Sequence, residues 1–137
     1  MLFRSGARDS ALGSRIAGQI EEALLRKKIN AAVFDFSGQT TLRELCVLLK
    51  MCSVVLTNDS GPMHLASALG TRVVVPFGST SAELTGPGLP GSAGHALLKS
   101  TAPCAPCFLR ECPIDFRCMR EHTVEKVVSA ALTLWNK

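Results

Sequence analysis

The sequence has few aromatic residues, few charged residues and no dense basic segment. Aromatic side chains make up 5% of the 137 residues, charged side chains make up 19%, and the formal net charge is +4. A protein that binds single-stranded nucleic acid needs a basic groove interleaved with stacking rings, so we expect no nucleic-acid partner. The small positive excess suits an anionic small ligand or a loose association with an anionic membrane surface.

Long apolar runs are also missing. No stretch of the sequence approaches the roughly 20 apolar residues that span a bilayer. The opening residues, MLFRSGARDS, lack the basic-then-apolar order of a signal peptide. We therefore predict a cytoplasmic protein. Thiols stay reduced in that compartment, so the six cysteines are expected to be thiols, metal ligands or reactive groups before they are disulfides.

The chain does contain apolar patterns that alternate between helix and strand. Hydrophobic residues make up 47% of a chain that is long enough for one domain with a core. Predicted helices cover residues 9–28, 41–50, 62–69 and 123–136, and predicted strands cover residues 31–36, 52–57, 72–78 and, as a short last strand, 95–100. This alternation is typical of an α/β fold, a Rossmann-like parallel sheet with helices on both faces. We predict a single domain over residues 1–137.

Polar residues mark the expected ends of two helices. Asp9 or Ser10 is the expected cap of the first helix, and Thr123 is the expected cap of the last, with Glu125 in its first turn. The opening residues 1–3 resemble the tail of a strand whose beginning is missing. That pattern predicts that the chain is a piece of something longer.

A polar loop separates the strand over 52–57 from the helix that follows it. In an open parallel sheet, ligands bind beyond the carboxyl ends of the strands, and the first N–H groups of a helix attract anions. Ser60 or Gly61 is the expected helix cap, and the amides of Gly61, Met63 and His64 are the expected phosphate donors. Asp59 is expected to accept a hydrogen bond from a sugar hydroxyl or from loop amides.

A second loop of similar composition follows the next strand. Residues 76–88 leave that strand through a glycine and two hydroxyl residues, Ser79 and Thr80. Because the two strands are successive, both loops are expected to face one opening. Two such loops form a diphosphate site more readily than either would alone.

Two other interpretations of the first loop stay open. The loop also fits a well-capped turn, with His64 as a half-buried helix residue. A hydrolase site with Ser60 as the nucleophile and His64 as the base is less favoured. A nucleophile elbow needs glycine two residues to either side of the serine, and Asn58 and Pro62 occupy those positions.

The segment TNDSGPMHLASALGTRVVVPFGSTSAELTGP, residues 57–87, resembles the C-terminal motif of glycosyltransferase family 9, the ADP-heptose–lipopolysaccharide heptosyltransferases. The likeness continues into CAPCFLRECPIDFRCM, residues 104–119, which is similar to the tail of the heptosyltransferase II subgroup. The resemblance covers nearly the whole chain. It implies the C-terminal, nucleotide-sugar-binding half of a GT-B fold, with the N-terminal acceptor domain absent.

The resemblance also implies roles for particular residues. Four residues of the first loop and helix, and two of the second loop, would bind the donor: Asp59, Ser60, Gly61, His64, Ser79 and Thr80. Asp9 would lie near the ribose and Glu44 near the adenosine. No residue here matches the family's catalytic base, so no catalytic residue is expected in this chain, and the whole enzyme would be an inverting transferase.

The resemblance also implies which molecules the protein binds. It implies ADP-heptose as donor and lipopolysaccharide core as acceptor, with peripheral contact to the inner membrane surface. No Asp-x-Asp metal motif is present, and we expect no cofactor. The alternatives are another GT-B nucleotide-sugar enzyme, such as an epimerase, or a metal- or redox-responsive interaction domain built around the cysteines.

The cysteines allow more than one interpretation. Four of them follow the spacing C-x2-C-x4-C-x5-C: Cys104, Cys107, Cys112 and Cys118. Four thiolates could enclose zinc or an iron–sulfur cluster, but structural zinc sites usually pair two tight hairpins and the second half here is loose. Reduced packing thiols or an adventitious disulfide are the other possibilities, and we expect no metal. Cys46 and Cys52 are expected to be ordinary core residues.

Overall fold

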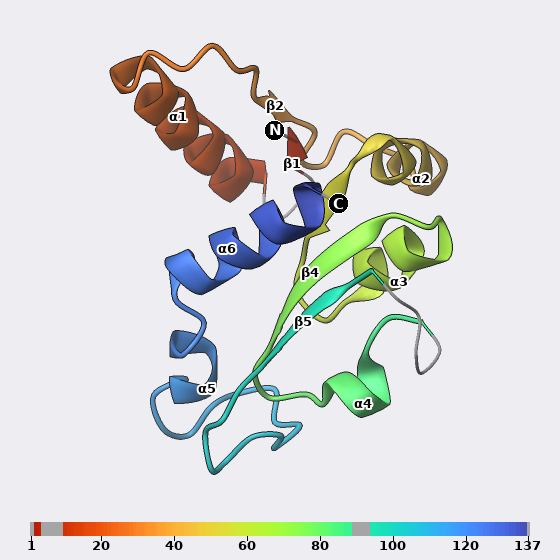
Figure 1. Ribbon diagram of the computed structural model, residues 1–137, viewed down its shortest axis with the longest axis vertical. Coiled ribbons are helices and arrows are strands. Elements are labelled where there is room, and N and C mark those ends of the chain that lie inside the picture. Colours follow the sequence, from red (N-terminus) through yellow and green to blue (C-terminus); the bar gives the residue numbers. More distant parts are fainter. Residues whose placement is uncertain (1, 4–9, 89–93, 137) are drawn as a thin grey trace. The chain divides into compact units, whose positions relative to one another are not determined.

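A computed structural model describes residues 2–3, 10–88 and 94–136 of the chain. The chain divides into two compact units, Met1–Leu45 and Cys46–Lys137 (Figure 1). The expectation of a single domain over residues 1–137 stays a prediction.

The first unit contains a two-stranded parallel sheet and one long helix. Strand β1 (Leu2–Phe3) pairs with β2 (Phe34–Asp35), and α1 (Ser10–Arg26) contacts β2. Gly13 of α1 is buried against Ser37 and Asp35, where a Cβ atom would not fit. A glycine is therefore required at this position of the helix.

Helix α2 (Leu42–Met51) begins with a reciprocal cap. The Thr41 amide and hydroxyl both donate to the Glu44 carboxylate at 2.8 Å, and the Glu44 amide donates back to the Thr41 hydroxyl at 3.3 Å. This is a capping box, in which two otherwise unpaired amides are satisfied. The Thr41 hydrogen bonds lower the pKa of Glu44. Glu44 is thus used to start its own helix.

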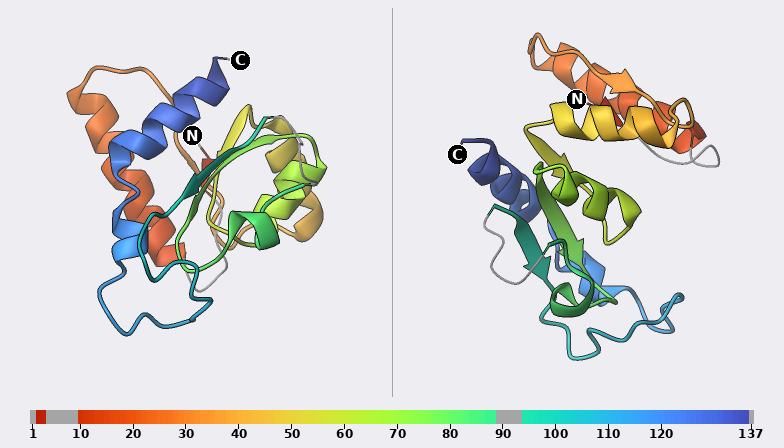
Figure 2. Two further views of the ribbon diagram at one scale, coloured as in Figure 1. Left: turned by 60° about the horizontal axis from the view of Figure 1, so that its bottom comes forward. Right: turned by 90° about the vertical axis from the view of Figure 1, so that its right-hand side faces the viewer.

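The second unit is built on a three-stranded parallel sheet in the order β3-β4-β5. The strands are β3 (Val54–Leu56), β4 (Arg72–Phe77) and β5 (Ala96–Lys99). Helix α3 (Gly61–Ala68) joins β3 to β4 and lies on one side of β4, while α6 (Val124–Trp135) lies on the other side and contacts all three strands (Figure 2). The prediction of an α/β fold with a parallel sheet is confirmed.

The core of this unit is centred on β4. Val73, Val74 and Val75 are fully buried, and Met63 and Ala66 of α3 are buried beside them. A strand buried on both faces has a continuous apolar sequence, so burial explains the run of valines. The carboxyl end of β4 is thereby fixed relative to α3.

The helix and strand predictions differ from the structure mainly at the ends. The helix predicted over 9–28 ends at Arg26, and the part of that prediction that falls on Asp9 lies outside the described residues. The strand predicted over 31–36 is confined to Phe34–Asp35 and pairs with β1, so residues 2–3 are a strand as expected. The Thr123 hydroxyl accepts a hydrogen bond from the Lys126 amide at 3.4 Å, which confirms the predicted cap of α6.

Two short helices were not predicted. Helix α4 (Ala82–Thr85) lies in the glycine- and proline-rich region, and α5 (Arg117–Arg120) lies in the cysteine-rich region. A helix of one turn has no recurring apolar period, so its sequence carries no helical pattern. In the part of the chain that the structure describes, no helix is both long enough and apolar enough to cross a membrane.

Candidate functional site

The loop after β3 lies at the carboxyl edge of the sheet. Strands β3 and β4 are parallel, with Leu56 opposite Val74, and the Thr57 amide extends the pairing by donating to the Val74 carbonyl at 3.1 Å. The loops that follow these two strands therefore leave the sheet at one edge, as predicted. In open parallel sheets this edge is where ligands bind.

Ser60 precedes α3 but does not cap it with its side chain. Its hydroxyl donates to the carbonyl of Asn58 at 3.2 Å and to the Asn58 side-chain oxygen at 3.0 Å. The prediction of a Ser60 cap is right for the backbone position and wrong for the side chain. Asn58 lies two residues away and supplies acceptors within the loop, which explains why the hydroxyl bonds there.

The amide of Met63 is already in use. It donates to the Ser60 carbonyl at 3.0 Å, so the prediction that this amide faces a ligand is wrong. Of the three amides predicted as phosphate donors, those of Gly61 and His64 remain candidates. Gly61 is exposed, and a Cβ atom added there would meet nothing within 4 Å. The first turn of α3 is therefore open to a ligand at Gly61.

Asp59 joins the two loops. Its carboxylate accepts a hydrogen bond from the Thr85 hydroxyl at 2.6 Å, and Thr85 is the last residue of α4. The Thr85 hydroxyl is also within hydrogen-bond distance of the Ser81 carbonyl, at 2.9 Å, and this contact holds the hydroxyl in place. The Thr85 hydroxyl of the second loop occupies one Asp59 oxygen, and the expectation that Asp59 binds a sugar hydroxyl stays a prediction.

Helix α4 has a second attachment to the sheet. Glu83 forms an ion pair with Lys99, the last residue of β5, and accepts a hydrogen bond from the Ser81 hydroxyl at 2.8 Å. The Lys99 ammonium and the Ser81 hydroxyl lower the pKa of Glu83 to about 2. The carboxylate is therefore charged at neutral pH, and α4 is held between β5 and the loop after β3.

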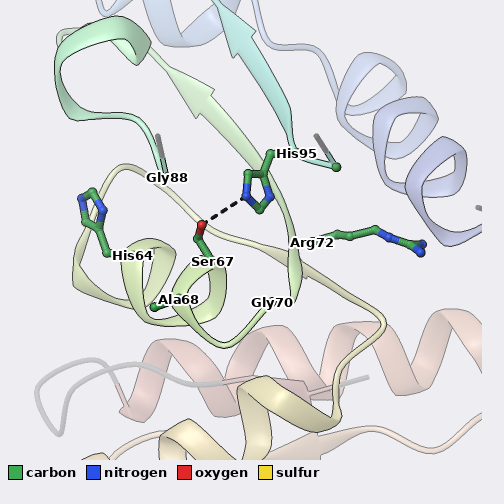
Figure 3. Close-up of a pocket in the computed structure, with 8 residues that line it drawn as sticks. His64, Ser67, Ala68, Gly70, Arg72, Gly88 and His95 are labelled. Atoms are coloured by element: carbon green, nitrogen blue, oxygen red, sulfur yellow. Dashed lines mark hydrogen bonds between the residues drawn. The ribbon is translucent and has the colours of Figure 1, made fainter. Parts of the chain in front are cut away.

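A cleft of about 440 Å³ opens beside α3 (Figure 3). It is lined by His64, Ser67, Ala68, Gly70, Arg72, Gly88, Gly94 and His95. His64 is exposed on α3 at one side of this cleft, so the interpretation of His64 as a half-buried helix residue is wrong. The Arg72 side chain points away from His64 and donates to the Leu134 carbonyl at 2.6 Å. A ligand in the cleft would therefore meet His64 rather than the Arg72 guanidinium.

The opposite wall of the cleft is fixed by His95. Its Nδ1 accepts a hydrogen bond from the Val73 amide at 3.3 Å, which leaves the ring proton on Nε2. Nε2 then donates to the Ser67 hydroxyl at 3.1 Å (Figure 3). Burial lowers the pKa of His95, consistent with a neutral ring. His95 thus links α3 to the sheet and is not available as a base toward Ser67.

The structure brings the predicted site residues together only in part. Asp59 and Ser60 lie in one loop, Ser79 and Thr80 in the neighbouring one, and all four are half-buried. His64 is the one predicted site residue among those that line the cleft. Two groups of the site are not marked by the sequence motifs: Thr85, and the Ser67–His95 pair. Their partners are 26 and 28 residues away in the sequence, so no local pattern marks them.

The cysteines form no preassembled metal site. All six are free thiols, and among the described residues no group of three or more His, Cys, Asp and Glu side chains could hold a metal ion. Cys118 is buried, whereas Cys107 is exposed. Cys46 and Cys52 are half-buried rather than deep in the core, and burial raises the pKa of Cys52.

The profile of glycosyltransferase family 9 (heptosyltransferase) matches residues 2–116. The chain belongs to this family. The match includes the β3–α3 loop, His64 and the loop after β4, which are the parts that form the candidate site. The resemblance inferred from the sequence motifs is thereby confirmed.

Individual members of the family show how much of an enzyme is present. The chain is 33% identical over 125 residues to lipooligosaccharide heptosyltransferase 2 of Campylobacter jejuni, covering 86% of this chain and 39% of that protein. It is 34% identical over 87 residues to lipopolysaccharide heptosyltransferase 2 of Escherichia coli K12, covering 64% of this chain and 23% of that protein. The chain therefore spans less than half the length of these relatives.

The fold agrees with that of a solved family member. The structure of E. coli ADP-heptose LPS heptosyltransferase II matches with a TM-score of 0.71 at 24% identity. The match covers 98% of this chain and 36% of that one. The chain thus has the fold of one part of a family 9 enzyme.

Proposed function

We propose that this chain is the nucleotide-sugar-binding part of a heptosyltransferase that transfers heptose from ADP-heptose to the lipopolysaccharide inner core. One observation carries the proposal. Two loops of a family 9 chain leave parallel strands at the same edge of the sheet, and the Thr85–Asp59 hydrogen bond joins them. That edge is where open parallel sheets bind nucleotides.

The proposed donor site consists of six residues: Asp59, Ser60, Gly61, His64, Ser79 and Thr80. In this proposal the diphosphate lies at the first turn of α3, where the helix dipole favours negative charge and Gly61 leaves room for close approach. His64 donates to a phosphate oxygen from the cleft wall. The hydroxyls of Ser79 and Thr80 line the other side of the diphosphate.

The proposal assigns no catalytic residue to this chain. Inverting transfer needs a base that deprotonates the acceptor hydroxyl and an environment that stabilises the departing ADP. In the proposal, α3 and His64 serve the second requirement. The base and the lipopolysaccharide acceptor site belong to the remainder of a complete enzyme, and the relatives are long enough to contain that remainder.

The proposed partners place the reaction in the cytoplasm, with peripheral contact to the inner membrane where the acceptor lies. The relatives support the partners through their names, which specify lipooligosaccharide or lipopolysaccharide heptosyltransferases. No observation favours an epimerase or a metal- or redox-responsive interaction domain.

Titration calorimetry with ADP tests the proposal, with UDP and GDP as matched ligand controls. We expect ADP to bind and UDP and GDP to bind more weakly, because the three ligands share the diphosphate and differ in the nucleobase. A parallel assay with ADP-heptose and a lipopolysaccharide acceptor should show no transfer by this chain alone. Absence of ADP binding, or turnover by the isolated chain, would overturn the corresponding part of the proposal.

A further inference from the structure

The turn that follows β4 is held from outside the sheet. The Phe77 carbonyl, at the last residue of β4, accepts a hydrogen bond from Nε2 of His122 at 2.8 Å. His122 is half-buried and 45 residues away in the sequence. Ser79 and Thr80 follow Phe77 in the chain by two and three residues. The position of the second loop of the proposed site therefore depends on a residue far from it in the chain.

A second hydrogen bond reaches the same turn from the same region. The Phe108 amide donates to the Ser79 carbonyl at 2.7 Å. Phe108 has a φ of 56°, a left-handed conformation that is uncommon for a bulky residue. The backbone is thus held in an unfavourable conformation where its amide bonds the Ser79 carbonyl.

Packing adds a third contact. Gly78 is buried, and a Cβ atom there would lie 2.8 Å from Cγ of Met119 and 3.3 Å from Sγ of Cys118, both in α5. The missing side chain at Gly78 lets α5 approach the turn. Three successive residues, Phe77, Gly78 and Ser79, are therefore each contacted by the cysteine-rich segment, residues 101–122.

The cysteine-rich segment is itself attached to the sheet. The Glu121 carboxylate accepts hydrogen bonds from the Ser100 hydroxyl at 2.8 Å and the Thr101 amide at 2.7 Å, just after β5 ends. These bonds lower the pKa of Glu121. The neighbouring His122 amide donates to the Met119 carbonyl at 3.1 Å. The cysteine-rich segment is thus hydrogen-bonded both to the chain just after β5 and to the last residue of β4.

We infer that the cysteine-rich segment is a positioning element of the donor site, and that His122 is a positioning residue that acts through the Phe77 carbonyl on Ser79 and Thr80. The inference rests on the proposed function for the ligand, a nucleoside diphosphate. It gives the segment a role that needs no metal and no disulfide.

The test compares three variants of the chain, with ADP as the probe. His122→Leu removes the donor to the Phe77 carbonyl, and His122→Gln keeps a side-chain N–H donor at this position. Thr71→Val is the matched control, because the Thr71 hydroxyl donates to the Leu49 carbonyl at 2.9 Å just before the opposite end of β4. Each variant is measured for ADP affinity, melting temperature and amide exchange at residues 78–80.

We expect His122→Leu to speed amide exchange at residues 78–80 and to weaken ADP binding about tenfold, the change expected if the displaced loop loses one hydrogen bond to the diphosphate. His122→Gln should restore both. Thr71→Val should lower the melting temperature with unchanged ADP affinity and unchanged exchange at residues 78–80. Unchanged affinity in His122→Leu, or equal loss of affinity in Thr71→Val, overturns the inference.

Amide exchange separates this inference from the proposed function. If the wild-type chain binds no ADP, the proposed function fails, and exchange at residues 78–80 in His122→Leu still decides whether His122 holds the turn. If His122→Leu does not fold, Glu121→Gln replaces it, because this change weakens the attachment after β5 without altering the turn itself. Exchange at residues 78–80 identical to wild type in Glu121→Gln would then overturn the inference.

Discussion

The Thr85 hydroxyl donates to the Asp59 carboxylate at 2.6 Å, across the two loops of the candidate site. The positive end of α3 already favours the negative charge of Asp59, and the Thr85 hydroxyl gives the carboxylate a hydrogen-bond partner within the protein. One Asp59 oxygen is occupied by a donor from α4, and the half-buried carboxylate is thereby held in the loop. The same bond fixes α4 relative to the first loop, so the shape of the site depends on both.

Replacing Thr85 with valine should loosen the junction of the two loops. Thr85→Val keeps the shape of the side chain but leaves Asp59 without this donor. We expect unfolding free energy to fall by about 1–2 kcal/mol, near the lower end for hydrogen bonds to charged groups, and ADP affinity to fall with it. Urea unfolding and calorimetry measure both quantities.

Thr133→Val is the control for this change. The Thr133 hydroxyl donates to the Ser129 carbonyl at 2.9 Å within α6 and is exposed. This variant should leave the unfolding free energy nearly unchanged and ADP affinity at the wild-type value. If Thr85→Val behaves like Thr133→Val in both measurements, the Thr85–Asp59 bond does not organise the site.

Gly61→Val should separate ligand binding from stability. A Cβ atom at Gly61 meets nothing within 4 Å, so the protein has room for a larger side chain. A valine side chain there would occupy the space that a ligand at the first turn of α3 needs. We therefore expect ADP binding to be lost while the melting temperature stays within a few degrees of wild type. Gly18→Val in α1, another open helical glycine, is the control and should bind ADP normally. ADP binding by Gly61→Val at wild-type affinity would contradict the proposed site.

The fold of the second unit could be read largely from the sequence. The sequence predicts a helix over 62–69, and α3 lies at Gly61–Ala68; it predicts a strand over 72–78, and β4 lies at Arg72–Phe77. Both have long apolar patterns bounded by glycine, because they form the buried centre of the unit. Strand β2 was predicted too long, and the exposure of Phe34 shows that an apolar residue does not by itself mean a buried strand.

The site could be predicted less completely than the fold. The strand–loop–helix order indicates Asp59, Ser60 and His64, because a loop that leads from a parallel strand into a helix lies at the carboxyl edge of the sheet. The roles of Thr85 and His95 depend on contacts between distant segments, which no local period records. Even at Ser60, the choice between a helix cap and the nearby Asn58 acceptors was decided by loop geometry.

His64→Ala should weaken ADP binding without affecting the fold. The His64 side chain is exposed, so its removal leaves no cavity in the core. We expect a loss of about 1–3 kcal/mol in binding free energy, the scale for a hydrogen bond to a charged group, and an unchanged melting temperature. His64→Gln, which keeps a donor, should retain part of the affinity. A lowered melting temperature together with wild-type affinity would show that His64 has a structural role.

His95 should make the stability of the second unit depend on pH. Burial lowers the pKa of His95 in the folded protein, so as the pH falls the unfolded chain takes up a proton before the folded one does. The contribution of neutral His95 to the unfolding free energy is therefore fully present above the unfolded pKa of about 6.5. It declines as the pH falls toward the lower pKa of the folded protein. Protonation would also remove the Nδ1 acceptor that the Val73 amide uses.

The non-titrating variant His95→Gln isolates this effect. A glutamine side chain offers an amide oxygen toward the Val73 amide or an amide N–H toward Ser67, but it carries no charge at any pH. Urea unfolding at pH 5, 6, 7 and 8 should give a decline for the wild-type protein below about pH 6.5 that is shallower for His95→Gln, because the remaining titrating groups are common to both proteins. Parallel curves would mean that His95 carries no share of the pH dependence. A steeper decline in His95→Gln would mean that its folded pKa is raised rather than lowered.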